Sequence, residues 1–142
     1  MKTEITRAQL AEAAQAVKGL VSKDGLSAFS KIRLDASGCL SVTGSNGDVQ
    51  VEWRLEDGEI ENTGTATLPG AAFVSFVAAM PEGKVEIDDD FGEKVRMRGG
   101  GVVFRLAAGE AIDFPMMAGP KDEAKAALHI GAVLFREMLR KV

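Results

Sequence analysis

The sequence predicts an α+β fold built from two copies of one unit, each a strand followed by a helix and three further strands. A strand–turn–helix pattern occurs three times, and its aliphatic anchors Ile5, Leu68 and Ile130 lie 63 and 62 residues apart. After each anchor, apolar residues recur at helical spacing, and between the helices they alternate with period two. A constant spacing of this length indicates a repeated supersecondary unit.

The first unit is placed at residues 1–62. Thr6 and Gln9 predict a capping box at the start of a helix over residues 7–18, because a threonine hydroxyl caps the helix and a glutamine three residues later reaches back. Asn46-Gly47 predicts a tight hairpin turn, since both residues tolerate a positive φ. The anchor strand precedes the helix, and the three strands expected after it cover residues 27–34, 40–43 and 49–55.

The second unit, at residues 63–118, follows the same plan. Pro69 suits the first helical position, where no N–H donor is needed. The strand expected before it covers residues 64–68, the helix 70–80, and the later strands 84–88, 94–98 and 102–107. We expect these eight strands to form an antiparallel sheet with both helices on one face.

The tail reads as the start of a third unit. Residues 119–125 are polar and turn-prone, which is typical of a linker. Residues 126–130 are expected to form a strand, and a helix is expected from there to Val142. This orphan strand and helix would open a second domain, truncated before its three strands.

Composition indicates a soluble globular protein of 142 residues, with 46% hydrophobic and 27% charged residues. No apolar run approaches the ~20 residues that span a bilayer. The single cysteine, Cys39, cannot form an internal disulfide, which fits a cytoplasmic location, and we expect it to be a small core residue.

No residue pattern indicates an enzyme, a metal site or a cofactor. The run Asp88-Asp89-Asp90 lacks the spacing of a calcium loop and is interpreted as a solvated strand end. His129 is the only histidine, so neither a triad nor a histidine metal site is predicted. The net charge of −4 does not indicate a nucleic-acid binder, although overall charge hides asymmetry between faces.

Several motifs, taken in order, resemble one family. They are residues 40–46 (LSVTGSN), Thr67-Leu68-Pro69 with Phe73, residues 80–83 (MPEG), 92–98 (GEKVRMR), 104–106 (FRL) and 111–115 (AIDFP). The chain resembles, over essentially its whole length, the N-terminal domain of the bacterial DNA polymerase III beta subunit with the start of the second domain. The resemblance implies a clamp-like domain at residues 1–118 and a non-enzymatic processivity factor in DNA replication, which encircles duplex DNA and tethers the replicative polymerase.

The resemblance also implies site residues. In the family, basic side chains on helices that line the ring contact DNA; the matching or nearby candidates here are Arg7, Lys18, Lys23, Arg136, Arg140 and Lys141. Favourable interaction with a helix dipole is the alternative explanation for basic residues at helix ends. The helix over residues 70–80 carries no charge where family members have basic residues, and we expect it to press on its sheet with alanine and serine toward solvent.

The strand over residues 102–107 is expected to be an open sheet edge. In the family, the positions of Phe104 and Leu106 pack against another subunit, and Ala72 stands where family interfaces use a basic residue. The alternative is an ordinary core-facing strand.

The partners that the resemblance implies are duplex DNA, other clamp subunits or further copies of this chain as a homo-oligomer, and polymerase III components through the parent clamp. A ring made of this chain alone would need about six copies. The alternative function is a stand-alone clamp-like module that binds or regulates a full clamp without encircling DNA.

Overall fold

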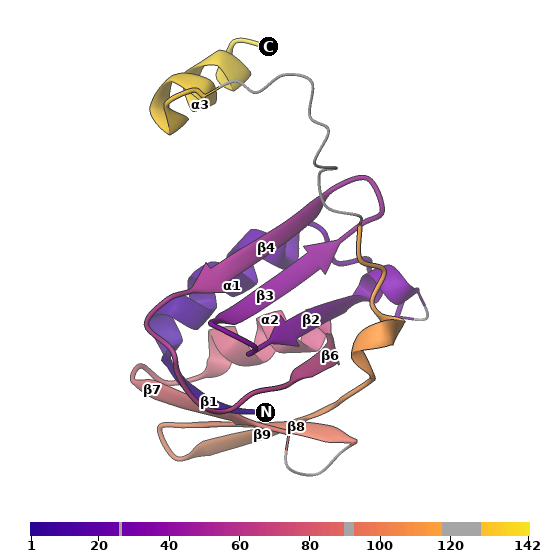
Figure 1. Ribbon diagram of the computed structural model, residues 1–142, viewed down its shortest axis with the longest axis vertical. Helices are drawn as coiled ribbons and strands as arrows, with labels where there is room; N and C mark the ends of the chain where they lie inside the picture. The colour runs from indigo at the N-terminus through magenta and orange to yellow at the C-terminus, as the bar shows by residue number, and fades with distance from the viewer. Residues whose placement is uncertain (26, 90–92, 118–128) are drawn as a thin grey trace.

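The computed structural model describes residues 1–25, 27–89, 93–117 and 129–142 (Figure 1). In chain order the elements are β1 (Lys2–Thr6), α1 (Arg7–Lys18), η1 (Ala28–Ser30), β2 (Lys31–Asp35), β3 (Leu40–Ser45), β4 (Gln50–Leu55), β5 (Glu59–Asn62), β6 (Thr65–Pro69), α2 (Gly70–Ala79), β7 (Lys84–Asp88), β8 (Lys94–Gly99), β9 (Val102–Ala107), η2 (Ala111–Asp113) and α3 (Ala132–Arg140). The α+β class is confirmed, and the second unit has the predicted order of strand, helix and three strands; the first unit has the same order with one additional strand, β5, at its end.

The strands form two antiparallel sheets rather than the single sheet that we expected. One has the order β5-β1-β7-β8-β9 and the other β4-β3-β2-β6. Each unit contributes its first strand to the sheet of the other unit: β1 pairs with β7, placing Ile5 opposite Val85, and β6 pairs with β2, placing Leu68 opposite Ile32. This exchange ties the two repeats into one domain, which the order of elements along the chain does not reveal.

Two local features also depart from the prediction. Strand β5 was not expected, because its sequence Glu-Ile-Glu-Asn has a single apolar residue and therefore no hydrophobic face. Residues 28–30, expected to extend the strand, form the 3₁₀ turn η1 instead. The Ser27 hydroxyl accepts a hydrogen bond from Phe29 N at 3.2 Å, and the Ser30 hydroxyl donates to Ser27 O at 2.6 Å. Such serine bonds compete with strand pairing.

Helices α1 and α2 pack against each other and cover one face of the four-stranded sheet (Figure 1). The predicted cap of α1 is confirmed, because the Thr6 hydroxyl accepts from Gln9 N at 3.3 Å. The glutamine half of the capping box differs: the Gln9 side-chain oxygen accepts from the Thr6 hydroxyl, and its amide donates to Asp57 at 2.8 Å.

The predicted hairpin turn joins β3 and β4, with Gly47 at φ +95°. Asn46 does not adopt a positive φ; its side-chain oxygen instead accepts from Asp48 N and Val49 N at 3.0 and 2.8 Å.

The core lies between the helices and the two sheets. Leu10, Ala13, Ala14 and Val17, the stripe predicted for α1, are buried. A Cβ on Gly44 of β3 would lie 2.9 Å from Val17 Cβ, so α1 approaches this strand as closely as a glycine allows. Burial of apolar area here is the main source of stability.

The segment after β9 returns over the four-stranded sheet. Gly109 bridges to Thr67 of β6, and Phe114 is buried. The predicted last helix is confirmed as α3, whereas His129 and Ile130 are exposed and not in a strand. The remainder of the predicted strand, residues 126–128, and the predicted linker at 119–125 lie outside the described residues. No helix in the described ranges is both long and apolar enough to span a membrane.

Candidate assembly edge and DNA-facing helices

The first candidate surface is an apolar patch between α2 and β9, which we call the α2–β9 patch: Ala72, Phe76, Val102 and Phe104. The rings of Phe76 and Phe104 stack with centroids 4.4 Å apart and 9° between their planes. All four residues are half-buried. Among the described strands, β9 pairs with β8 alone, so the patch borders an open sheet edge.

The three residues predicted for a subunit interface differ in whether another subunit could reach them. Phe104 and Ala72 belong to the α2–β9 patch and are reachable from outside, whereas Leu106 is only 3% exposed and belongs to the core. Side chains at alternate positions of β9 face the same side. Leu106 thus packs beneath the patch. The alternating sequence pattern of this strand does not distinguish such a buried residue from one that contacts another subunit.

Helix α2 is buried on one side only. Phe73 and Val77 are buried, while Ala71, Ser75 and Ala78 are exposed. The Ser75 hydroxyl bonds to Ala71 O at 2.9 Å, within the helix. The interpretation that this uncharged helix presses on its sheet with small residues toward solvent is therefore confirmed.

Arg7, predicted to face DNA, is held by the domain itself. Its Nε and Nη2 donate to the carbonyls of Val77 and Ala78 at 3.3 and 3.2 Å, and its Nη1 binds Glu82 at 2.8 Å. These carbonyls end α2, where a helix has unsatisfied acceptors and a partial negative charge. Arg7 therefore caps α2 and connects it to α1; few of its donors remain for phosphate groups.

The other predicted cations are exposed. Lys18 ends α1 and Lys23 lies in the following loop, and neither has an ion-pair partner within the described part of the chain. Arg7 and Lys18 stand at opposite ends of α1, about 16 Å apart along its axis. Arg136 and Arg140 lie one turn apart on α3, with Lys141 just after it.

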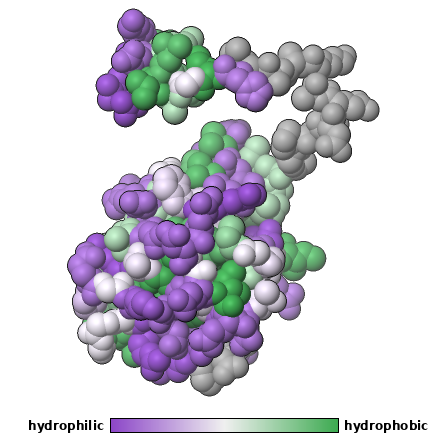
Figure 2. Space-filling model, turned by 60° about the vertical axis from the view of Figure 1, so that its left-hand side comes forward, coloured by the Kyte–Doolittle hydropathy of each residue, from purple (hydrophilic) through white to green (hydrophobic). Residues whose placement is uncertain are grey.

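Helix α3 exposes both its charged side and its apolar side. Leu134, Phe135, Met138 and Leu139 are 48–60% exposed, and no residue of the helix is buried. Figure 2 shows hydrophobic side chains gathered on this helix beside hydrophilic ones, whereas the face of the main body in this view is mainly hydrophilic.

The five-stranded sheet carries several ion pairs. Glu61 hydrogen-bonds Lys2 and raises its pKa, and Glu4 does the same for Lys84. Asp88 pairs with Arg96, and Asp89 with the N-terminal ammonium. Each of these two carboxylates binds a cation of the protein itself; Asp90 lies outside the described residues. No group of three metal-ligating side chains occurs within the ranges that the structure describes.

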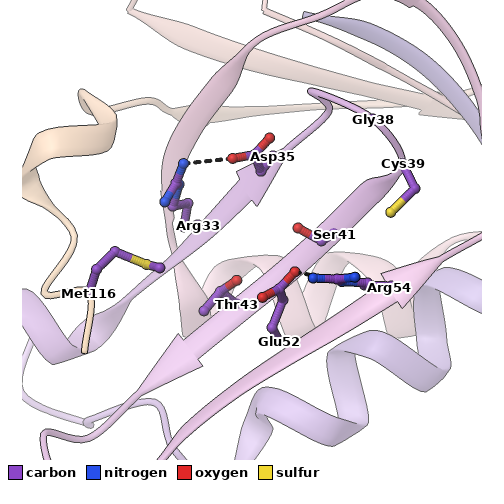
Figure 3. A pocket seen from close by; sticks show the side chains of 9 residues that line it. All are labelled: Arg33, Asp35, Gly38, Cys39, Ser41, Thr43, Glu52, Arg54 and Met116. Carbon is purple, nitrogen blue, oxygen red and sulfur yellow. Dashed lines mark hydrogen bonds and ion pairs between the residues drawn. The ribbon is translucent and has the colours of Figure 1, made fainter. Parts of the chain in front are cut away.

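One hollow was not anticipated from the sequence. It lies on the outer face of the four-stranded sheet, opposite the helices, and Cys39 is half-buried at its wall rather than in the core (Figure 3). The only signal in the sequence is the alternation of polar residues along three strands, which is also the pattern of a plain solvent-facing sheet.

The fold and these surfaces define a class of protein. Two strand-exchanged repeats of strand, helix and three strands, with neighbouring helices on one face and an open strand edge, form a DNA-clamp domain.

The chain belongs to the family of the DNA polymerase III beta subunit, N-terminal domain, which matches residues 1–118. The DNA polymerase sliding clamp of Bacillus subtilis is 27% identical, with a TM-score of 0.79 over 86% of this chain and 34% of the clamp chain. The DNA polymerase III beta chain of Streptococcus pneumoniae is 16% identical, with a TM-score of 0.88 over 99% of this chain and 39% of that one.

The beta subunit of Streptococcus pyogenes is 18% identical, with a TM-score of 0.79 over 87% of this chain and 34% of that one. At these identities the two streptococcal structures show the fold alone. The chain spans between a third and two-fifths of the length of these solved clamps. No curated protein matches the sequence.

Proposed function

We propose that this chain is a module of a sliding clamp, a non-enzymatic processivity factor that encircles duplex DNA in the cytoplasm and tethers the replicative polymerase. The family match over residues 1–118 carries the proposal. The expected partners are duplex DNA, other clamp subunits or copies of this chain, and polymerase III components that bind the complete clamp. In this proposal residues 1–118 form the clamp domain and residues 126–142 belong to the beginning of a second clamp-like domain.

Assembly through the edge of β9 is the first step of this proposal. The unpaired strand edge supplies backbone donors and acceptors for another strand, and the α2–β9 patch supplies apolar contact beside it. Phe104 and Ala72 are the predicted contact residues, with Leu106 supporting them from the core.

The mass in solution, measured by light scattering across protein concentrations, tests assembly. A species of about six chains supports a ring made from this chain alone. The variant Ala72→Glu should disrupt it, because a charge enters the apolar patch, whereas Ala71→Glu on the neighbouring exposed position should not. A monomer at every concentration contradicts self-assembly and assigns the domain to a longer clamp chain.

DNA contact is the second step. Among the predicted cations, those available to phosphate groups are Lys18 and Lys23 near one end of α1, Arg136 and Arg140 on α3, and Lys141 just after it. Such contacts are independent of sequence and weaken steeply with salt, with a slope of about 0.9 per phosphate on logarithmic axes. Fluorescence anisotropy with a duplex at several salt concentrations, comparing Arg140→Gln with the sheet-face variant Lys2→Gln, tests this step.

The second candidate function is a clamp-like module that binds or regulates a full clamp without encircling DNA. Two observations favour it: α2 carries no charge, and the donors of Arg7 are taken up by α2 and Glu82. If this chain binds an intact clamp and does not bind duplex DNA at any salt concentration, this second proposal replaces the first.

A further inference from the structure

The outer hollow has a volume of about 400 Å³ and opens on the face of the four-stranded sheet that the helices leave uncovered (Figure 3). Charged and hydroxyl side chains of three strands line it: Arg33, Asp35, Ser41, Thr43, Glu52 and Arg54. The turn between β2 and β3 and Met116 of the returning segment complete the wall. Its size falls in the range of small-molecule sites, and its lining is mixed, with charged and hydroxyl groups that can orient a polar ligand.

Strand register arranges the charges of this hollow in a square. Ser41 lies between Asp35 and Arg54, and Thr43 lies between Arg33 and Glu52. The two arginines therefore occupy one diagonal and the two carboxylates the other, with the hydroxyls in the middle. Because the four charges cancel, the hollow has no net attraction for a simple anion or a simple cation.

Within the described part of the chain, the two central hydroxyls form no hydrogen bond with another side chain. Ser41 is 6% exposed and Thr43 is 4% exposed, and both side chains line the hollow. Neither oxygen is fully buried, so water reaches both, whereas Nε of the neighbouring Arg33 is buried without a partner among the described residues. A ligand that displaces this water must therefore offer acceptors or donors at the centre of the hollow.

Each ion pair leaves hydrogen-bonding capacity unused. Arg54 binds Glu52 through Nε at 2.9 Å, so its two terminal nitrogens remain available, as does the second oxygen of Glu52. Arg33 binds Asp35 through Nη2 at 2.6 Å, while Asp35 also accepts from Ser37 N at 2.9 Å. The Glu52–Arg54 pair is the more exposed of the two and is free to rearrange around a ligand.

We propose that the outer hollow binds a small zwitterion of the α-amino-acid class. The ligand's carboxylate accepts hydrogen bonds from the terminal nitrogens of Arg54 and from the Ser41 and Thr43 hydroxyls. Its ammonium group donates to the second oxygen of Glu52. The Glu52 carboxylate and the Arg54 guanidinium lie next to each other, and the ammonium and carboxylate groups of an α-amino acid are also close together. One α-amino acid can therefore bind both side chains at once. This site is separate from the clamp function proposed above.

Glycine and its two halves test the proposal directly. Glycine carries both charges, acetate only the negative one and methylammonium only the positive one. In an NMR titration of the intact chain, we expect glycine to shift the backbone amide signals of Ser41, Thr43 and Arg54 saturably. It should bind about 10-fold more tightly than acetate or methylammonium, because each half loses one charged hydrogen-bonded contact.

Two variants locate the binding. Arg54→Gln and the isosteric Thr43→Val should each weaken glycine binding about 10-fold. The matched control is Arg98→Gln, which removes an exposed arginine paired with Glu86 at 2.9 Å on the other sheet, and it should leave binding unchanged. Because Arg54 is exposed, its variant will fold even where Thr43→Val does not. Acetate binding as tight as that of glycine, no saturable shift, or equal binding by Arg54→Gln would each overturn the proposal.

Discussion

Helices α1 and α3 follow the same strand–turn pattern in the sequence, yet only α1 buries its apolar side. Leu10 and Val17 of α1 have no exposed surface, whereas Leu134 and Met138 of α3 are 56% and 51% exposed. The difference lies in the surroundings, because α1 has α2 and two sheets to pack against. Helical periodicity therefore predicts which side chains share a face, but burial requires a partner surface.

The largest expected effect is a cavity beneath α1. Leu10→Ala should lower the free energy of unfolding by about 2–5 kcal/mol, since a fully buried leucine leaves an unfilled space. Urea unfolding followed by circular dichroism measures it. The same change on α3, Leu134→Ala, should leave the midpoint of the main transition where it is. A loss of similar size in both variants would show that α3 is packed in solution and would remove the contrast.

The next largest effect tests how closely α1 packs against β3, in contrast to the open surroundings of α3. Gly44→Ala places a methyl group 2.9 Å from Val17 Cβ and should cost about 1–3 kcal/mol of stability through overpacking. Gly131→Ala, just before α3, has no neighbouring atom within 4 Å of the new methyl group and should cost nothing. Thermal unfolding of the two variants compares them; an unchanged melting temperature for Gly44→Ala would mean that α1 sits farther from β3.

The arginine at the start of α1 should matter for stability, and the one at the end of α3 should not. Arg7→Gln removes contacts to Val77, Ala78 and Glu82 and should cost about 1 kcal/mol, because two carbonyls at the end of α2 lose a charged donor. Arg140→Gln serves as the control in the same denaturant titration. Arg7→Gln with wild-type stability but weaker duplex binding would instead return Arg7 to the DNA-contacting set.

The smallest expected effect is a pH dependence of stability that comes from the surface ion pair between Glu4 and Lys84. Glu4 raises the pKa of Lys84 above its ordinary value in the folded state. A raised lysine pKa stabilises the fold while the lysine is protonated, and this contribution disappears as the pH rises through the folded-state pKa. Thermal unfolding at neutral and strongly alkaline pH should show a smaller alkaline loss in Lys84→Gln than in the wild type. Equal losses would mean that this pair contributes nothing measurable.

The features that the sequence does not predict share a physical cause. Pairing with β1, and not its own hydrophobicity, makes β5 a strand. The division into two sheets depends on the pairing of β1 with β7, which joins residues about 80 positions apart in the chain. The sequence places Arg7 among the predicted DNA-facing cations but does not reveal its contacts with the end of α2. Each of these features is a contact between distant segments, which local periodicity does not encode.

The sequence by itself determined the helices, most strands, the Thr6 cap, the Asn46-Gly47 turn and the family, because these follow from side-chain period, backbone preference and the order of short motifs. Only the tertiary structure decided that the units exchange their first strands, that Leu106 is core while Phe104 borders an open edge, and that two ion pairs enclose the Ser41 and Thr43 hydroxyls. The physical reason is that burial and hydrogen-bond satisfaction depend on which distant surfaces meet, and that is settled by packing the whole chain.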